Sequence, residues 1–415
     1  MSKNLLIKKV KHKDEETDVL IESGKITRLG KNLKARASKT IDGRGKAILP
    51  GFYNLHTHAA MTLLRGYAED VELEEWLTKK IWPAEAKFSE EDIYWGTKLA
   101  CLEMIKSGTV CFNDMYWHQE AALQAVAETR LRAFIGLTMI DGHSLGFHKD
   151  KNEAWEKIKK KQTAKIKFAL APHALYTVAR ENLEWAARFA KDNKLLIHFH
   201  VSETEKEVAD CREKYDCRPI EFLDKIGFLD SNVILAHSIW LSEKEIKILA
   251  QRKCHLVYNP TSNMKLSSGV MSFSKLKREG INICLGTDSA SSNNNLDMME
   301  EVKLAAVLQK LTNGQEIKVK DVFAAATRNG ARALGIKSGI VKEGQEADFI
   351  LVDTERLDFL PGFNLLNDLV FSASSECVDT VVCGGDILME NREIQGEKEF
   401  IKEIKKRYGA CQGRA

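Results

Sequence analysis

Through the middle of the chain, short runs rich in β-branched and aromatic residues alternate with stretches in which apolar positions recur every three or four residues. The runs predict strands at 50–58, 108–115, 132–140, 166–173, 195–203, 232–238, 254–263 and 281–288. The clearest helical stretches are 90–106, 180–194, 242–252 and 273–280. Alternation of this kind is typical of parallel strands joined by helical crossovers, and eight such units close a barrel.

Side chains capable of chemistry stand at the C-terminal ends of the predicted strands. In chain order these ends carry His56 and His58, Asp114, Asp141, His173, His200 and Glu203, His237, Asn259 and Asp288. Packing alone gives a buried strand no reason to end repeatedly in His, Asp or Glu. A β/α barrel has a reason, because its active site lies at the carboxyl face of its strands. An open doubly wound sheet would need a glycine-rich phosphate loop after the first strand, and the sequence has none there.

Both ends of the chain differ from the middle. They contain short strand-like segments punctuated by glycine, at 18–21, 26–29, 41–48, 348–353 and 378–388. The 415 residues also exceed what one barrel needs. The pattern predicts an α/β protein with a (β/α)8 barrel at residues 51–337. A small β-sandwich domain is expected to be formed jointly by residues 1–50 and 338–415.

Composition narrows the classes of partner. The formal net charge of +3 is too small to favour nucleic acid or an anionic membrane as the main partner. The sequence contains neither an apolar run of roughly 20 residues nor an apolar signal segment near its start. Nine cysteines occur without a C-x-x-C pair, and Cys101, Cys254 and Cys284 lie in apolar runs. This usage predicts reduced, mostly buried thiols in a cytoplasmic protein.

Four of the strand-end residues predict a metal site. His56 and His58 are two positions apart on a strand, so both imidazoles point to the same side. His200 and Asp288 end other strands at the same face of the barrel. Three imidazoles and one carboxylate suit Zn²⁺ or Fe²⁺, and a catalytic site leaves a position open for water. We therefore expect one divalent ion per chain.

Other histidines are assigned different roles. His198 faces the same side as His200 but lies farther from the strand end, so we expect a buried, hydrogen-bonded histidine there. His237 could be a fifth ligand, but we prefer a role in holding the catalytic water by a hydrogen bond. His143 and His148 follow the third strand and could line the pocket, although surface roles are the default.

Several segments together are similar to a known family. They are PGFYNLHTHAAMTLLRG (50–66), HFHVSET (198–204), AHS (236–238), YNPTSN (258–263), LGTDSASSNN (285–294) and GIVKEGQEADF (339–349). The combination covers nearly the whole chain. It resembles the amidohydrolase superfamily, and most nearly its 5′-methylthioadenosine/S-adenosylhomocysteine deaminases.

The resemblance implies hydrolytic removal of the 6-amino group of an adenosine-type nucleoside, with release of ammonia. It assigns the metal to the four residues named above and the substrate to positions matching Glu85, His173, Glu203 and Asp288. Glu203 would carry a proton from water to the purine N1, and Asp288 would pass another to the departing amine. Glu85 would accept the ribose hydroxyls. The implied partner is thus a small nucleoside, and a homo-oligomer is possible.

One departure from the family bears on the substrate. Deaminases that act well on S-adenosylhomocysteine are expected to place arginines just after the third strand, but residues 137–148 contain none. A substrate carboxylate therefore has no evident bidentate partner. This leaves 5′-methylthioadenosine, adenosine and 5′-deoxyadenosine open beside S-adenosylhomocysteine.

Other functions remain as alternatives. Guanine, cytosine and aminodeoxyfutalosine deaminases and triazine-type hydrolases share the implied scaffold. A two-metal cyclic amidase would need a lysine where His173 ends the fourth strand. The zinc deaminases with a Pro-Cys-x-x-Cys motif are excluded, because the sequence has no Pro-Cys pair. A noncatalytic binding protein is the least favoured, since every metal and proton-transfer position is filled.

Overall fold

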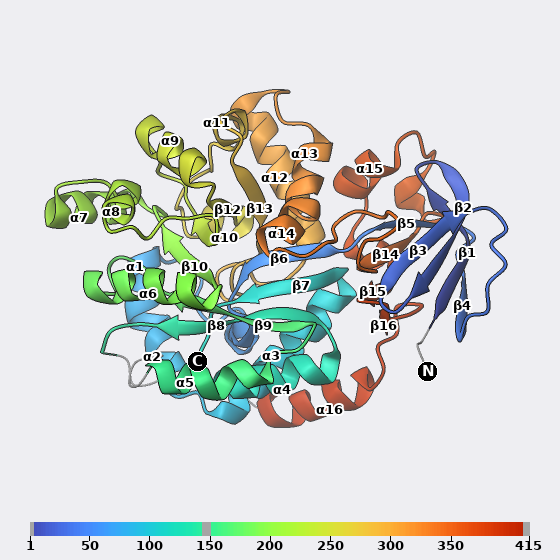
Figure 1. The fold of residues 1–415 in the computed structure, drawn as a ribbon, viewed down its shortest axis with the longest axis horizontal. Coiled ribbons are helices and arrows are strands. Elements are labelled where there is room, and N and C mark those ends of the chain that lie inside the picture. Colours follow the sequence, from blue (N-terminus) through green and yellow to red (C-terminus); the bar gives the residue numbers. More distant parts are fainter. Residues whose placement is uncertain (1–3, 143–150, 410–415) are drawn as a thin grey trace.

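The computed structural model describes residues 4–142 and 151–409. Within them, eight parallel strands form one sheet in which neighbours pair in chain order (Figure 1). They are β6 (Phe52–Thr57), β7 (Thr109–Asp114), β8 (Arg132–Met139), β9 (Ile166–Pro172), β10 (Leu196–Val201), β11 (Val233–His237), β12 (His255–Tyr258) and β13 (Asn282–Leu285). Their side chains are almost all buried, and helices cover the outside. The predicted barrel is confirmed.

The first and last strands meet at a seam beside the predicted metal ligands. The side-chain amide of Asn54 accepts the N–H of Thr287 at 3.0 Å and donates to its hydroxyl at 2.7 Å. The N–H of Asp288 donates to the carbonyl of His56 at 2.9 Å. A Cβ at Gly286 would lie only 2.8 Å from the backbone nitrogen of His56, so this close approach requires glycine. Closure of the barrel therefore places Asp288 against His56.

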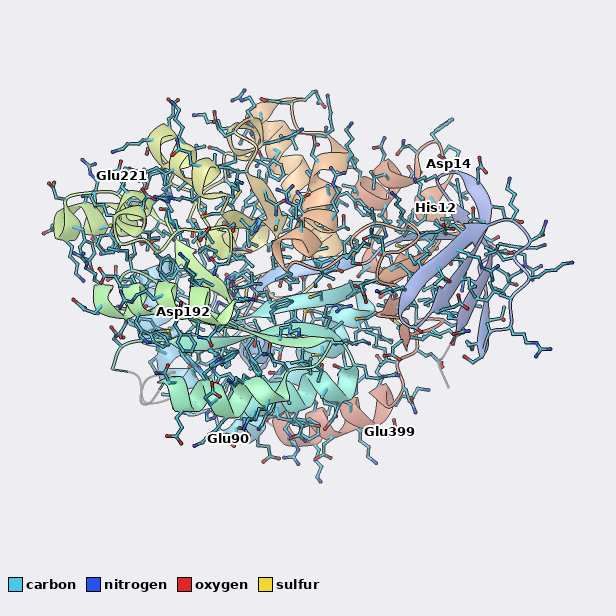
Figure 2. All side chains as sticks on the ribbon, viewed as in Figure 1. His12, Asp14, Glu90, Asp192, Glu221 and Glu399 are labelled. Carbon is cyan, nitrogen blue, oxygen red and sulfur yellow. The ribbon has the colours of Figure 1, made fainter. Side chains whose placement is uncertain are left out.

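Helices connect and surround the barrel strands. They include α3 (Glu90–Lys106), α4 (Gln119–Thr129), α5 (Lys151–Ile158), α6 (Arg180–Asn193), α7 (Glu205–Tyr215), α8 (Pro219–Lys225), α9 (Glu243–Arg252), α11 (Phe273–Arg278), α12 (Met298–Asn313), α13 (Val319–Ala325) and α14 (Arg328–Ala333). Helix α3 has the predicted bounds, and its start is fixed by a reciprocal capping box of Ser89 and Asp92. Charged residues such as Glu90 and Asp192 lie exposed on these helices (Figure 2).

Several predicted strands were wrong in extent; the segment 378–388, for example, contains two strands, β15 (Val378–Cys383) and β16 (Asp386–Met389). The strand expected at 254–263 ends at Tyr258, because Pro260 opens the short helix α10 (Pro260–Lys265). Proline fits the first helical turn, where its missing N–H costs nothing. The segment 41–48 contains parts of two strands, β4 (Lys39–Asp42) and β5 (Lys46–Pro50). They are separated by a turn in which Gly45 adopts a φ of +72°.

Both chain ends join in a second sheet, which within the described residues has eight strands of mixed direction. These are β1 (Leu5–His12), β2 (Glu15–Glu22), β3 (Lys25–Gly30), β4, β5, β14 (Phe349–Asp353), β15 (Val378–Cys383) and β16 (Asp386–Met389). The register of β1 shifts between Ile7 and Val10, so its first half pairs with β4 and its end with β5. The sheet encloses its own hydrophobic core. A β-sandwich was predicted for this domain, whereas its described strands are hydrogen-bonded into one continuous sheet.

The C-terminal segment also returns to the barrel. Helix α16 (Glu397–Tyr408) packs on α3, where the rings of Phe400 and Trp95 stack with centroids 5.5 Å apart. The hydroxyl of Tyr408 donates to Asp92 at 2.7 Å. The small elements before it are η4 (Leu357–Phe359), α15 (Leu365–Asn367), η5 (Asp368–Ser372) and η6 (Ser375–Cys377). The domain boundaries 1–50, 51–337 and 338–415 stay a prediction.

Two features of the composition have a structural counterpart. Across residues 4–142 and 151–409, no helix combines the length and the apolar character needed to cross a bilayer. The cysteines of these residues are free and buried. Cys101, Cys254 and Cys284 are among them, as predicted from their apolar surroundings.

A buried ion pair links the barrel to the small sheet. The guanidinium of Arg132, at the start of β8, lies 3.2 Å from the carboxylate of Asp348, just before β14. Asp348 also accepts the hydroxyl of Tyr53 at 2.9 Å and the N–H of Gly384 at 2.6 Å. Both charged side chains are almost fully buried. Each of these two buried charges is therefore stabilised by the other.

We expect Asp348→Asn to lower the free energy of unfolding by about 3–5 kcal/mol, because it leaves the buried Arg132 charge with only the partly exposed Glu346, 3.8 Å away, as a counterion. Tyr53→Phe removes one hydrogen bond to the same carboxylate and should cost less, about 1.5 kcal/mol. Urea denaturation of both variants beside the unchanged protein measures the difference. Equal losses in the two variants would contradict a structural role for the charge pair.

Candidate metal centre and substrate cavity

Four predicted ligands meet at the carboxyl end of the barrel. His56 and His58 come from the end of β6, His200 from β10, and Asp288 from the loop after β13. Oδ1 of Asp288 lies 3.2 Å from Nε2 of His56 and 3.4 Å from Nε2 of His58. Nε2 of His200 lies 3.3 Å from Nε2 of His58. The fold thus brings these four side chains to one point.

Hydrogen bonds on the far side of the rings decide which nitrogen faces this point. Nδ1 of His58 donates to the carbonyl of Met115 at 2.7 Å, and Nδ1 of His200 donates to the carbonyl of His173 at 2.8 Å. A carbonyl can only accept, so each Nδ1 carries the proton. The Nε2 atoms then present lone pairs to the centre, which is the tautomer that binds a metal.

His56 is oriented by a second histidine. Nε2 of His198 lies 2.8 Å from Nδ1 of His56, and both rings are fully buried. When His56 presents the lone pair of Nε2 to the centre, its Nδ1 donates to His198. His198 was predicted to be a buried, hydrogen-bonded histidine, and the structure shows that its partner is His56. Sequence reasoning had not identified that partner.

The donor set fits a divalent cation. Burial lowers the pKa of His56 to about 4 and holds the pKa of His200 well below its usual range, so these rings are neutral at pH 7. Burial raises the pKa of Asp288, but the surrounding imidazoles outweigh this effect and keep the pKa below its usual range, so the carboxylate is ionised. Nε2 of the buried His56 has no hydrogen-bond partner. Lone pairs only 3.2–3.4 Å apart repel one another unless a positive charge lies among them.

Two serines hold the other oxygen of Asp288. Oδ2 accepts the hydroxyl of Ser262 at 2.5 Å and that of Ser292 at 2.9 Å. Sequence reasoning missed both residues as part of the site. Both lie in segments that carried the family resemblance, at 258–263 and 285–294, which was the available signal. With Oδ2 held in this way, only Oδ1 faces the imidazoles.

Glu203 and His237 lie beside this cluster. Oε1 of Glu203 accepts the hydroxyl of Ser268 at 3.1 Å, and Oε2 lies 3.7 Å from Nε2 of His237. Burial, followed by the nearby charge of Asp288, raises the pKa of Glu203 to about 8. The amide nitrogen of Asn263 lies 2.8 Å from Nδ1 of His237 and fixes the ring. A protonated carboxyl group is therefore available at neutral pH.

A cavity opens beside the cluster. Glu85, His173, Glu203, His237 and Asp288 all line it. Several apolar lining residues come from the segment 73–82, which comprises α1 (Leu73–Glu75), η2 (Trp76–Ile81) and the start of α2 (Trp82–Glu85). All five predicted substrate or proton-transfer residues thus reach one cavity.

Glu85 is held by a residue that the sequence had not suggested. The hydroxyl of Tyr116 donates to Oε1 of Glu85 at 2.6 Å. Burial raises the pKa of Glu85 to about 7, against the lowering effect of this hydrogen bond. The second carboxyl oxygen of Glu85 is thereby left for another partner in the cavity.

Two strand-end carboxylates do not line the cavity, contrary to the prediction that the strand ends carry the chemistry. Asp114 accepts the N–H of Ala59 at 2.8 Å and so fixes the chain just after His58. Asp141 accepts the N–H of Ala179 at 2.6 Å and supports the start of α6. Both satisfy backbone donors that would otherwise be unpaired. His143 and His148, suggested above as pocket residues, lie outside the described residues.

Comparison with known proteins agrees with this geometry. Residues 47–388 match the model of the amidohydrolase family. The chain belongs to the amidohydrolase family. This membership confirms the resemblance drawn from the sequence segments.

Members of the amidohydrolase family with similar sequences include two archaeal proteins. A 5-methylthioadenosine/S-adenosylhomocysteine deaminase 1 of Archaeoglobus fulgidus is 45% identical over 399 residues, covering 94% of this chain and 93% of that protein. A 5′-deoxyadenosine deaminase of Methanospirillum hungatei is 43% identical over 380 residues, covering 90% and 85%. A solved adenosine deaminase from Xanthomonas campestris with bound zinc has a TM-score of 0.91 and 31% identity, covering 98% of each chain.

Proposed function

We propose that this amidohydrolase is a metal-dependent deaminase. It removes the 6-amino group of an adenosine-type nucleoside by hydrolysis, which yields the inosine analogue and ammonia. The observation that carries the proposal is the buried Glu203, whose pKa is raised to about 8 where it lines the cavity beside the converging ligand atoms. The names of the similar archaeal deaminases support the same reaction.

His56, His58, His200 and Asp288 would hold one divalent ion. Three neutral imidazoles and a carboxylate suit Zn²⁺ best, with Fe²⁺ as the second choice. The bound zinc in the similar adenosine deaminase supports this preference. When bound, such an ion lowers the pKa of water toward neutrality and supplies a nucleophile.

The cavity residues would manage the protons of the reaction. Glu203, protonated at neutral pH, donates to the purine N1, and this makes C6 more electrophilic. With the amide nitrogen of Asn263 facing Nδ1, His237 carries its proton on Nε2 and can orient the attacking water. Asp288, steadied by two serine hydroxyls on Oδ2, accepts a proton and returns it to the departing amine.

Glu85 and His173 would bind the rest of the nucleoside. Tyr116 occupies one oxygen of Glu85, and the other can accept ribose hydroxyls. Burial lowers the pKa of His173 to about 3, so its ring is neutral. Nδ1 of His173 lies 3.0 Å from the hydroxyl of Thr177, which leaves Nε2 for the purine.

The cavity favours an uncharged 5′ substituent. Its apolar lining includes Leu73, Trp76, Leu77 and Ile81. Among the residues that the structure describes around the cavity, none is lysine or arginine. A substrate carboxylate would lie there without a countercharge, which is costly. We therefore rank 5′-methylthioadenosine and 5′-deoxyadenosine above S-adenosylhomocysteine.

The buried free thiols suit a reducing compartment. On this ground we propose that the protein works in the cytoplasm.

A screen of adenine nucleosides by loss of the adenine ultraviolet chromophore tests the reaction and its specificity. We expect kcat/KM for 5′-methylthioadenosine or 5′-deoxyadenosine to be at least as high as for S-adenosylhomocysteine. The reason is that none of the described residues lining the cavity is a lysine or arginine that could pair with the carboxylate of S-adenosylhomocysteine. A strong preference for S-adenosylhomocysteine would overturn the ranking. Absence of turnover with every adenine nucleoside would overturn the deaminase proposal itself.

Metal analysis tests the ligand set. Protein purified without chelator should contain close to one Zn or Fe per chain. His200→Ala should lose the metal and the activity, because it removes a proposed ligand. His198→Ala should keep all four ligands but lower metal affinity by roughly 10–100-fold, because it frees the ring of His56. Two metals per chain in repeated preparations would refute the single-ion site.

Two isosteric variants separate proton transfer from substrate binding. Glu203→Gln should keep fold and metal but lower kcat by roughly two to four orders of magnitude, because it removes the transferable proton. Glu85→Gln should mainly raise KM and reduce discrimination against the 2′-deoxy analogue, because it weakens the proposed ribose contact. Near-normal turnover by Glu203→Gln would show that the proton-transfer assignment is wrong.

A further inference from the structure

A second carboxylate holds the turn that carries Glu203. Glu207 lies in the first turn of α7, and its side chain points back past the start of the helix. Oε1 accepts the N–H of Ser202 at 2.9 Å, and Oε2 accepts the N–H of Glu203 at 2.8 Å. The N–H of Glu207 in turn donates to the hydroxyl of Thr204, the N-cap, at 3.1 Å.

This arrangement does more than cap the helix. In an ordinary capping box, the acidic side chain returns to the N–H of the N-cap residue itself. Here the N-cap is Thr204, and the carboxylate of Glu207 instead takes the two N–H groups that precede it. One of these belongs to Glu203, the residue to which the proton transfer is assigned.

The turn needs such support because its backbone is strained. Ser202 adopts a φ of +52°, which is uncommon for a residue with a Cβ. Its carbonyl accepts the N–H groups of Ile239 and Trp240, each at 3.0 Å. Both the N–H and the carbonyl group of Ser202 are therefore hydrogen-bonded. The fixed backbone of Ser202 in turn sets the direction in which the side chain of Glu203 leaves the chain.

We propose that Glu207 is a positioning residue for the deamination, and that its carboxylate clamps two adjacent backbone N–H groups so that the Glu203 carboxyl group is aimed at the substrate. The inference rests on the proposed function. It assigns Glu207 no contact with substrate or metal. Glutamine cannot replace it, because only one of its terminal atoms accepts and its NH2 group would face the second N–H.

The test is Glu207→Gln in the full-length, metal-loaded protein, with 5′-methylthioadenosine as the probe substrate. We expect kcat to fall roughly 10–100-fold, because small displacements of a catalytic group have effects of this size. KM and metal content should change little, since the ligands and Glu85 are untouched. Glu205→Gln is the matched control, because it makes the same substitution in the same helical turn at an exposed position.

A double variant distinguishes positioning from a general structural effect. If Glu207 acts through Glu203, adding Glu207→Gln to Glu203→Gln should lower kcat no further. A further loss equal to that of Glu207→Gln alone would overturn the proposal. So would wild-type kcat in Glu207→Gln. If the wild type and Glu205→Gln deaminate no adenine nucleoside, the proposed function fails first.

Glu207→Ala covers the case in which the glutamine variant does not fold. It removes both acceptors without placing an NH2 group against a backbone donor, and the same drop in kcat with unchanged KM is expected. Failure of both variants to fold, with Glu205→Gln folded, would overturn the proposal by assigning Glu207 to folding alone. Circular dichroism and metal content report the folded state.

Discussion

The mutual repulsion of converging lone pairs is the constraint around which this molecule is arranged. Nε2 of His58 and His200 and Oδ1 of Asp288 each lie within 3.2–3.4 Å of another ligand atom, and the rings of His56 and His200 are neutral. Such atoms do not attract one another. They are held together by hydrogen bonds on their outer sides, to Met115 and His173 among others. The protein supplies this preorganisation, and a cation would relieve the repulsion.

Hydrogen bonds of the backbone next to these ligands close the barrel. The N–H of Asp288 bonds to the carbonyl of His56, and the adjacent Asn54–Thr287 pair joins the first strand to the segment after the last. A change that loosens this seam would therefore also displace Asp288 from the histidines. Stability of the barrel and geometry of the centre are consequently coupled, and Gly286 is restricted by the same close approach.

The buried carboxyl groups of this site differ in pKa because their surroundings differ. Asp288 stays ionised beside His56 and two serine hydroxyls. Burial and the charge of Asp288 raise the pKa of Glu203 to about 8, and burial raises that of Glu85 to about 7. One group is thus suited to accept a proton or hold a cation, and another to donate a proton. This division is what a deamination requires.

Local sequence patterns determined the strand–helix alternation, the bounds of α3 and the shared direction of His56 and His58, because each depends on neighbours a few positions away. The residues at the predicted strand ends gave the four expected ligands, and segment resemblance determined the family. Tertiary structure alone decided that Tyr116 holds Glu85 and that two serines hold Asp288. It also decided that Asp114 and Asp141 serve backbone N–H groups. These partners are distant in the chain or reached through turns. Their pairing depends on barrel closure and loop paths, which leave no periodic signal in the sequence.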